Sequence, residues 1–446
     1  MKTTLTLHRQ AEIVNPPDEV RNLIISAMTL PNPKFVEAQK RGRYVGHLDP
    51  ELRFYETCGN TVTFLRGFAR HAILALKGRW GFEIRDRRRV IEPTHMKFRG
   101  QLRLYQQEAV NVALKREHGI LEMPTGAGKT TAALYMIAER RQPTIVLVHN
   151  LELAHQWVER ARQFLGIEAG LFANGKREIR ELTIATPQTA RKHLNELPKH
   201  FGYLVADEAH RGPALAYAEV IRAFDCRFLT GLTGTCYRND NLGRLIFLLM
   251  GDRVCKVDRS SLVKVGAIVK PEVFTKQTAF TYPYADDYAA MIGALTADQE
   301  RNRQIIRDLE AAARNKSGTS LVISDRKAHL YTLAGMIESG RVAVLTGDQS
   351  AKERARIVAE LKRGAIDVLL STTSLISEGF DAANLNALFI ASPIKFKGRL
   401  VQAVGRILRP APYKKALIFD YQDIKQPVLA AAGRYRARAL AEIAMV

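Results

Sequence analysis

Cysteine is scarce in this chain. Only four of its 446 residues are cysteines, namely Cys58, Cys226, Cys236 and Cys255, and no two of them form a Cys-x-x-Cys pair. This spacing argues against a disulfide framework and against a zinc site built on paired cysteines. It fits a reducing compartment, so the sequence predicts a cytoplasmic protein.

Long apolar runs are missing as well. No segment approaches the roughly 20 consecutive apolar residues that a membrane-spanning helix needs. The first residues, 1–9, lack the apolar centre of a signal peptide. The sequence therefore predicts no membrane partner. It also shows no low-complexity segment and no short-period repeat.

Acidic residues are outnumbered. The chain has 67 Lys and Arg against 45 Asp and Glu, a net charge of +22. An excess of this size indicates a polyanionic partner, and without a membrane segment nucleic acid is favoured over an acidic membrane. Within residues 1–96 the densest basic run is Arg85-Asp86-Arg87-Arg88-Arg89. It is either a binding patch or a solvated strand edge.

The length and the hydrophobic pattern predict several domains, because 446 residues exceed what one core usually holds. Residues 1–96 contain short β-prone segments and one helical segment, which indicates a small α+β domain. From residue 97 onward, apolar strands alternate with helices, and the series restarts after residue 264. The predicted fold class is α/β, with doubly wound parallel-sheet lobes at 97–264 and 265–425 and a basic tail at 426–446.

The segment from Met123 to Thr131 reads Met-Pro-Thr-Gly-Ala-Gly-Lys-Thr-Thr and lies between an apolar strand and a helix. Glycines allow the backbone N–H groups of such a loop to point at a polyphosphate. Lys129 can reach the β and γ phosphates, and Thr130 can hold Mg²⁺. The expected ATP contacts are Thr125, Gly126, Ala127, Gly128, Lys129, Thr130 and Thr131. The alternative is a glycine turn before an ordinary helix.

A second motif, Asp207-Glu208-Ala209-His210, follows the apolar strand 203–206. A carboxylate at the carboxyl end of a strand faces the crevice where α/β sheets bind ligands. We expect Asp207 to hold Mg²⁺ directly or through water, and Glu208 to polarise the attacking water. His210 would sense the γ phosphate. The alternative is a pair of solvated surface acids.

Together these two motifs resemble those of superfamily 2 helicases of the DEAH-box type. Four further motifs follow the order of that family, at Leu102–Gln106, Leu232–Thr235, Ser377–Asp381 and Gln402–Arg409. The resemblance implies two RecA-like lobes and ATP hydrolysis with Mg²⁺ as the metal. It also implies that Arg103 and Gln106 recognise the adenine.

The resemblance assigns the nucleotide further contacts in the second lobe, at Gly379 and Asp381. Gln402, Arg406 and Arg409 would belong to its catalytic set. Guanidinium groups stabilise the charge on a phosphoryl group in transfer and can be donated across a cleft. Catalysis would then require the lobes to close on ATP. The alternative for Arg406 and Arg409 is a cationic surface helix.

The same comparison implies nucleic-acid contacts in both lobes. Hydroxyl and amide groups suit phosphate and sugar contacts, which carry little sequence information. The matching positions are His149, Asn150, Gln156, Thr186, Gln188, Arg238, Ser324, Arg326, Thr372 and Thr373. Any one of them could instead be an ordinary helix cap.

Within the superfamily, Gly231–Asp240 resembles the XPB and UvsW branch. XPB-like proteins carry Arg-Glu-Asp there, whereas this chain has Arg238-Asn239-Asp240. The missing carboxylate weakens a duplex-separating role for this loop. The small N-terminal domain before two compact lobes is similar to the architecture of phage branch-migration helicases.

The expected function is that of a 3′–5′ DNA helicase or translocase that remodels forks and four-way junctions. Its actions would be branch migration, fork regression, and strand unwinding or annealing, in DNA repair and recombination. We expect it to act as a monomer, at the nucleoid or in a phage-infected cell. The alternatives are an RNA helicase, a restriction or defence motor that translocates without unwinding, and a nucleotide-gated clamp.

Overall fold

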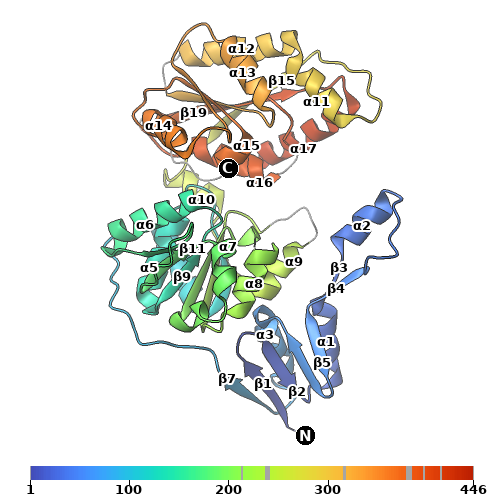
Figure 1. The fold of residues 1–446 in the computed structure, drawn as a ribbon, viewed down its shortest axis with the longest axis vertical. Helices are drawn as coiled ribbons and strands as arrows, with labels where there is room; N and C mark the ends of the chain where they lie inside the picture. Colours follow the sequence, from blue (N-terminus) through green and yellow to red (C-terminus); the bar gives the residue numbers. More distant parts are fainter. Residues whose placement is uncertain are drawn as a thin grey trace. The chain divides into compact units, whose positions relative to one another are not determined.

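In the computed structural model the chain forms two compact units (Figure 1). The first contains Met1–Met123 and Gly128–Val257, and the second contains Pro124–Ala127 and Asp258–Val446. The residues that the structure describes are 2–211, 214–236, 242–314, 318–377, 384–394, 397–411 and 414–444.

The N-terminal part of the first unit is a five-stranded sheet. Its order is β5 (Tyr55–Cys58), β6 (Thr61–Phe64), β2 (Ala11–Val14), β1 (Thr3–Leu7) and β7 (Phe82–Asp86), and only β7 runs parallel to its neighbour. Side chains alternate along β1, so Leu5 and Leu7 are buried while Thr4 and Thr6 are partly exposed. Helices α1 (Asp18–Met28) and α3 (Ala69–Leu76) share the apolar core of the buried face. A small appendage follows α1, with β3 (Thr29–Pro31), α2 (Pro33–Lys40) and β4 (Glu51–Arg53).

A seven-stranded parallel sheet forms the first lobe. Its order is β10 (Gly170–Phe172), β11 (Leu182–Ala185), β9 (Thr144–Leu147), β12 (Tyr203–Asp207), β13 (Phe228–Thr233), β8 (His118–Glu122) and β14 (Arg253–Lys256). The helices include α4 (Leu104–Leu114), α5 (Lys129–Arg140), α6 (Leu151–Leu165), α7 (Pro187–Ala190), α8 (Leu215–Ala223) and α9 (Gly243–Met250). Strands β9, β11 and β12 are buried along their whole length, as expected for a parallel sheet covered on both faces.

The N-terminal sheet and the first lobe share one hydrophobic core. Phe64 and Leu65 belong to the same buried cluster as Ile246 and Leu249 of α9. The Arg66 guanidinium donates a buried hydrogen bond to the backbone carbonyl of Cys226 at 3.0 Å. The region around residue 96 therefore separates two sheets, but these two sheets do not have independent cores.

A six-stranded parallel sheet forms the second lobe. Its order is β15 (Pro271–Gln277), β20 (Ala416–Gln422), β19 (Leu385–Ile390), β16 (Thr319–Ile323), β18 (Val368–Ser371) and β17 (Val342–Leu345). The helices are α10 (Arg259–Lys264), α11 (Tyr288–Ala297), α12 (Gln299–Arg314), α13 (Lys327–Gly335), α14 (Ala351–Lys362), α15 (Thr373–Ser377), α16 (Lys397–Ile407) and α17 (Pro427–Ala444). Two parallel-sheet lobes and a small mixed N-terminal sheet confirm the predicted fold class.

The predicted basic tail, 426–446, consists largely of helix α17. Leu429 and Leu440 of this helix are buried, and the Arg436 guanidinium is 3% exposed. Arg436 donates hydrogen bonds to the Asp420 carboxylate and to the carbonyl of Tyr421 on β20. This segment therefore belongs to the packing of the second lobe. Among the described helices, none is long and apolar enough to cross a bilayer.

A buried ion pair joins α12 to the residue that follows β20. Arg301 Nε donates to Asp423 Oδ1 at 2.8 Å, and the two side chains are 1% and 2% exposed. Arg301 also donates to the carbonyl of Ala391 at 2.7 Å, and the Thr278 hydroxyl donates to Asp423 at 2.6 Å. Both charges are therefore compensated within the protein interior.

Replacing Arg301 with alanine is expected to lower the free energy of unfolding by about 3–5 kcal/mol, because Asp423 would stay buried without its cation. Denaturant titration measures this loss. Arg303→Ala is the matched control, since Arg303 lies on the same helix but is exposed. It should change stability by less than about 0.5 kcal/mol. An equal effect of the two substitutions would contradict the prediction.

Candidate active site

The predicted residues of the first lobe lie along one edge of its sheet. The phosphate loop follows β8, His149 and Asn150 follow β9, and Asp207 ends β12. Strands β11, β9, β12, β13 and β8 are consecutive and parallel, so their carboxyl ends lie side by side. Residues distant in sequence thus come to one edge, where open α/β sheets bind ligands.

The phosphate loop leaves β8 at Met123 and enters α5 at Lys129. Gly126 and Gly128 have φ values of +87° and +78°, in the left-handed region that favours glycine. A Cβ atom on Gly128 would also lie 2.3 Å from the amide nitrogen of Gln106. The first N–H groups of α5 have no partner within the helix, so this end is suited to hold a phosphate group. Lys129 Nζ lies 3.5 Å from the carbonyl oxygen of Met123.

Gln106 lies beside this loop. Its side chain is buried, and its Oε1 accepts a hydrogen bond from the backbone N–H of Arg103 at 3.0 Å. The Arg103 guanidinium donates to the Tyr105 hydroxyl at 3.4 Å. The structure therefore brings Gln106 against the phosphate loop, whereas recognition of adenine by Arg103 and Gln106 stays a prediction.

Asp207 is a buried carboxylate, only 5% exposed. Its Oδ1 accepts the backbone N–H of Glu208 at 2.9 Å, and its Oδ2 accepts the indole N–H of Trp157 at 2.9 Å. Burial and the charge of Glu208 raise the pKa of Asp207 to about 6, although Lys129 opposes this shift. A carboxylate oxygen whose charge is costly in the free site is suited to a hard cation such as Mg²⁺. With Thr130 at the first turn of α5, the available donors are the oxygens that Mg²⁺ prefers.

Glu208 has a φ of +52°, which is costly for a residue with a Cβ atom. Burial would raise the pKa of its carboxyl group, but the charge of Lys129 and a hydrogen bond with His210 bring that pKa well below its ordinary value. Glu208 is therefore ionised, as a proton acceptor for an attacking water must be.

His210 connects this carboxylate to the next strand end. Its Nδ1 lies 3.2 Å from Glu208 Oε2 and 3.2 Å from the hydroxyl oxygen of Thr233. That hydroxyl in turn donates to the carbonyl of Thr235 at 2.6 Å. The segment 232–235 thus contacts the predicted catalytic carboxylate through one imidazole.

Trp157 and Tyr217 also support Asp207, and sequence reasoning missed both. The Tyr217 hydroxyl lies 2.9 Å from the carbonyl oxygen of Asp207 and 3.2 Å from that of Leu147. Trp157 is fully buried on α6. The sequence signal for Trp157 is that a buried indole N–H needs a hydrogen-bond acceptor. The sequence pattern does not identify Asp207 as that acceptor.

The predicted nucleic-acid contacts of the first lobe follow β9 and β11. Asn150 Oδ1 accepts the backbone N–H of Leu153 at 2.8 Å and so caps α6, while the Asn150 amide lies 3.3 Å from His149 Nε2. The Thr186 hydroxyl donates to the Thr189 hydroxyl at 3.0 Å. Gln188, which lies between these two threonines in the chain, is exposed. Gln156 is partly exposed on α6. The capping role and a nucleic-acid role can coexist at these loop positions.

The corresponding positions of the second lobe follow β16 and β18, which are neighbours in its sheet. Ser324 is buried with its hydroxyl 3.0 Å from His329 Nδ1, and Thr372 and Thr373 are also buried. Arg326 is the exposed member of this set.

On α16, Gln402 is partly exposed and Arg406 is 9% exposed, and Arg409 follows the helix. Three predicted residues, Arg238, Gly379 and Asp381, lie outside the described residues.

Two family models match the chain. Residues 99–238 match the family described as "Type III restriction enzyme, res subunit", and residues 301–411 match "Helicase conserved C-terminal domain". The two matches cover the segments that carry the phosphate loop, the Asp207 motif and the Arg406 motif.

The chain is 24% identical over 360 residues to "DNA 3'-5' translocase XPB2" of Sulfurisphaera tokodaii, covering 72% of this chain and 81% of that protein. It is 26% identical over 297 residues to "Probable helicase D10" of Escherichia phage T5, covering 65% and 64%. The chain spans little more than half of several longer relatives, such as the 57% of a Halobacterium salinarum helicase that it covers.

A fragment of a putative HsdR subunit of a type I restriction enzyme from Vibrio vulnificus has a similar structure. The TM-score is 0.61 at 18% identity, over 77% of this chain and 67% of that one. This likeness concerns the fold of the two lobes.

Replacing Trp157 with phenylalanine is expected to raise the Mg²⁺ concentration for half-maximal ATP hydrolysis by about 10-fold. Phenylalanine fills most of the volume but leaves Asp207 without its indole donor. A Mg²⁺ titration at fixed ATP measures this. Trp80→Phe, which replaces the only other tryptophan, is the control. An unchanged Mg²⁺ dependence in the folded Trp157 variant would contradict the prediction.

Proposed function

We propose that the chain is a superfamily 2 helicase of the XPB-like branch, acting as an ATP-dependent DNA helicase or translocase with 3′–5′ polarity. The observation that carries the proposal is the convergence of Lys129, Asp207 and Glu208 at one sheet edge, with His210 bonded to both Glu208 and Thr233. The relatives named as DNA 3′–5′ translocase and helicase support this polarity and DNA rather than RNA.

Each group at this edge has a separate task in hydrolysis. Lys129 and the N–H groups of the phosphate loop bind the β and γ phosphates. Thr130 and Asp207 would hold Mg²⁺, which neutralises phosphate charge when bound. Glu208 orients the attacking water and accepts its proton, because its carboxylate is ionised and held by His210.

The second lobe would complete the site with Gln402, Arg406 and Arg409, and with Gly379 and Asp381 at the nucleotide. Guanidinium groups stabilise the charge that develops on the transferring phosphoryl group. If they act from the second lobe, ATP favours closed lobes and hydrolysis allows opening. Alternating grip of the two lobes on one strand then produces translocation.

The proposed tracking strand runs over the loops at the carboxyl ends of both sheets. His149, Asn150 and Thr186 would contact it in the first lobe, and Arg326 in the second. Contacts from amides, hydroxyls and arginine to a sugar–phosphate backbone carry little sequence information. The net charge of +22 would add a salt-sensitive affinity.

The finer proposal concerns the substrate. We propose forks and four-way junctions in DNA repair or recombination, with one copy of the chain acting on each DNA. The N-terminal domain would dock the duplex arm ahead of the lobes. This role places the protein at the nucleoid or on phage DNA.

Lys129→Ala and Glu208→Gln should each lower DNA-stimulated ATP hydrolysis by about 10²- to 10⁴-fold while DNA binding persists. The first removes the phosphate cation and the second removes the proton acceptor without changing side-chain size. Phosphate release and DNA-binding titrations check the two parts. Lys176→Ala, at an exposed loop lysine, should leave both measurements unchanged. Retained turnover in either site variant would refute the site assignment.

A panel of labelled substrates tests the direction and the branched-DNA role. We expect unwinding of a duplex with a 3′ tail but not of one with a 5′ tail, because the proposed motor moves 3′ to 5′. We also expect faster processing of forks and four-way junctions than of blunt duplex. Gel separation of the products over time measures this. Strong ATP hydrolysis with no strand separation on any substrate would indicate a motor that translocates without unwinding.

A further inference from the structure

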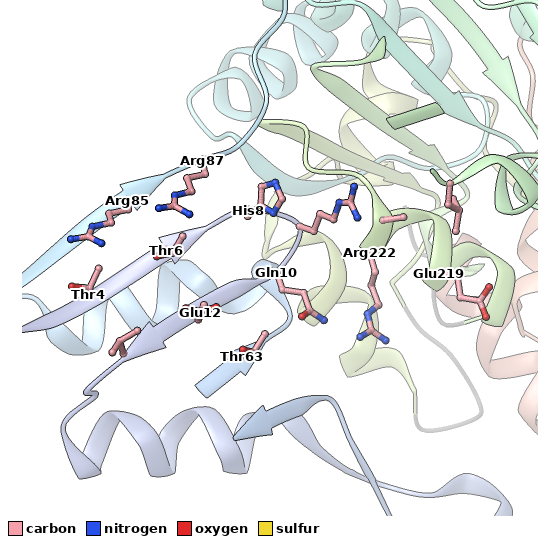
Figure 2. Close-up of a pocket in the computed structure, with 14 residues that line it drawn as sticks. Thr4, Thr6, His8, Gln10, Glu12, Thr63, Arg85, Arg87, Glu219 and Arg222 are labelled. Carbon is pink, nitrogen blue, oxygen red and sulfur yellow. The ribbon is translucent and has the colours of Figure 1, made fainter. Parts of the chain in front are cut away.

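Among the described residues, helices α1 and α3 share the apolar core on one face of the N-terminal sheet, and the other face borders a hollow. Thr4 and Thr6 of β1 lie on this face, since Leu5 and Leu7 point into the core. Together with α8 of the first lobe, this face borders an open hollow of about 980 Å³. Figure 2 shows strand residues on one side of it and Glu219 and Arg222 of α8 on the other. All of its lining residues belong to the first compact unit.

The hollow is rich in arginine. Arg9, Arg85, Arg87 and Arg222 line it, against Glu12 and Glu219. Glu219 is already paired with Arg191 outside the hollow, and Arg85 is paired with Glu83 at 3.0 Å.

Three of these arginines carry charge that the protein leaves uncompensated. Arg9, Arg87 and Arg222 are exposed, and no carboxylate of the described residues pairs with them. An exposed group of unpaired guanidiniums is a site for an anion.

The remaining lining groups suit phosphate oxygens. The hydroxyls of Thr4 and Thr6 lie on strand β1, next to β7 in a register that pairs Thr6 with Arg85. Thr63 of β6 adds a hydroxyl, and Gln10, between β1 and β2, adds an amide. Hydroxyl, amide and guanidinium groups are the usual donors to nucleic-acid backbones.

The lining also argues for a duplex rather than a single strand. Among the described residues that line the hollow, none is Phe, Tyr or Trp, and the His8 ring is engaged with Asp225 at 3.3 Å. Sites for single strands stack bases on aromatic side chains. Contacts to the backbone of paired strands need no stacking.

A part-buried ion pair and a buried hydrogen bond join the two sides of the hollow. Arg89 donates to Asp225 at 2.9 Å and 3.0 Å, just after the end of α8, and Arg66 donates to the Cys226 carbonyl. The strand arginines and Arg222 therefore hold a defined spacing. A DNA duplex bound in this hollow would therefore have a fixed position relative to the first lobe.

We propose that this hollow is a groove that docks the sugar–phosphate backbone of a DNA duplex arm. Its cations are Arg9, Arg85, Arg87 and Arg222. The proposal rests on the proposed function, because it supplies the duplex contact of a motor that tracks one strand. Deleting the N-terminal domain is a poor test, since that domain shares its core with the first lobe. Point substitutions of exposed arginines avoid this problem.

The test compares Arg87→Glu/Arg222→Glu with Arg177→Glu, a control at an exposed arginine in the loop before β11. Fluorescence anisotropy with a labelled blunt DNA duplex measures affinity over a series of salt concentrations. The double variant should bind at least about 10-fold more weakly, and its slope of log K against log salt should fall by about 2. Arg87→Gln/Arg222→Gln should shift both quantities in the same direction by less.

Single-stranded DNA serves as the second probe. Stimulation of ATP hydrolysis by an oligo-dT strand should be retained in the double variant, because the groove would not contact the tracking strand. If the double variant has the same duplex affinity and the same salt slope as the unmodified protein, the proposed docking groove is wrong. An equal loss of affinity for duplex and for single-stranded DNA in the double variant would also contradict the proposal. Absence of DNA-stimulated hydrolysis in the unmodified protein would instead remove the proposed function.

Discussion

The carboxylate of Asp207 is buried at the carboxyl edge of a parallel sheet, and a charge in that position needs compensation from several directions. The phosphate-loop helix contributes the charge of Lys129, α6 contributes the indole N–H of Trp157, and the chain itself contributes the N–H of Glu208. The Tyr217 hydroxyl of α8 holds the carbonyl of the same residue. Three helices, α5, α6 and α8, therefore meet at one aspartate. A cation and a triphosphate placed here meet a site whose parts are already positioned, which reduces the reorganisation needed for hydrolysis.

This arrangement also places two proposed tasks on a single helix. Asn150 caps the start of α6, at the loop proposed to touch the tracking strand, and Trp157 on the same helix reaches Asp207. Seven residues of α-helix span about 10 Å. A shift of α6 caused by nucleic acid would therefore move the donor to Asp207. The contact of His210 with both Glu208 and Thr233 provides a second connection, from the carboxylates to the segment after β13.

Much of the fold and of the candidate site was predictable from sequence for a physical reason. Parallel strands covered on both faces are continuous apolar runs, so segments such as Thr144–Leu147 and Tyr203–Asp207 stand out. Phosphate loops and strand-end carboxylates need fixed residue types at fixed spacing, which made Lys129 and Asp207 identifiable. Trp157 was not identified as a partner of Asp207, because periodicity assigns a tryptophan in an amphipathic helix simply to the core.

Tertiary packing decided the features that the sequence left open. The change in pattern near residue 96 predicted a small α+β domain but not its packing, in which Arg66 and Phe64 join the N-terminal sheet to the core of the first lobe. The segment 426–446 was predicted as a basic tail from its charge. Its arginines differ in burial: Arg436 is buried against Asp420, whereas Arg434 and Arg438 are not buried. Net charge cannot distinguish these cases, since it does not say which side chain meets a carboxylate.

Helix α8 shows why the groove and the ATP site can be neighbours and still be separable. Tyr217 and Arg222 are five positions apart, which at about 100° per residue turns their side chains toward different faces of the helix. The Tyr217 face packs on the sheet and holds the Asp207 carbonyl, while Arg222 points into the groove. A change of charge at Arg222 therefore leaves the buried hydrogen bonds of Tyr217 intact. A duplex arm held by Arg222 would nevertheless press on the helix that supports the metal-binding aspartate, so docking and hydrolysis share a structural element without sharing a residue.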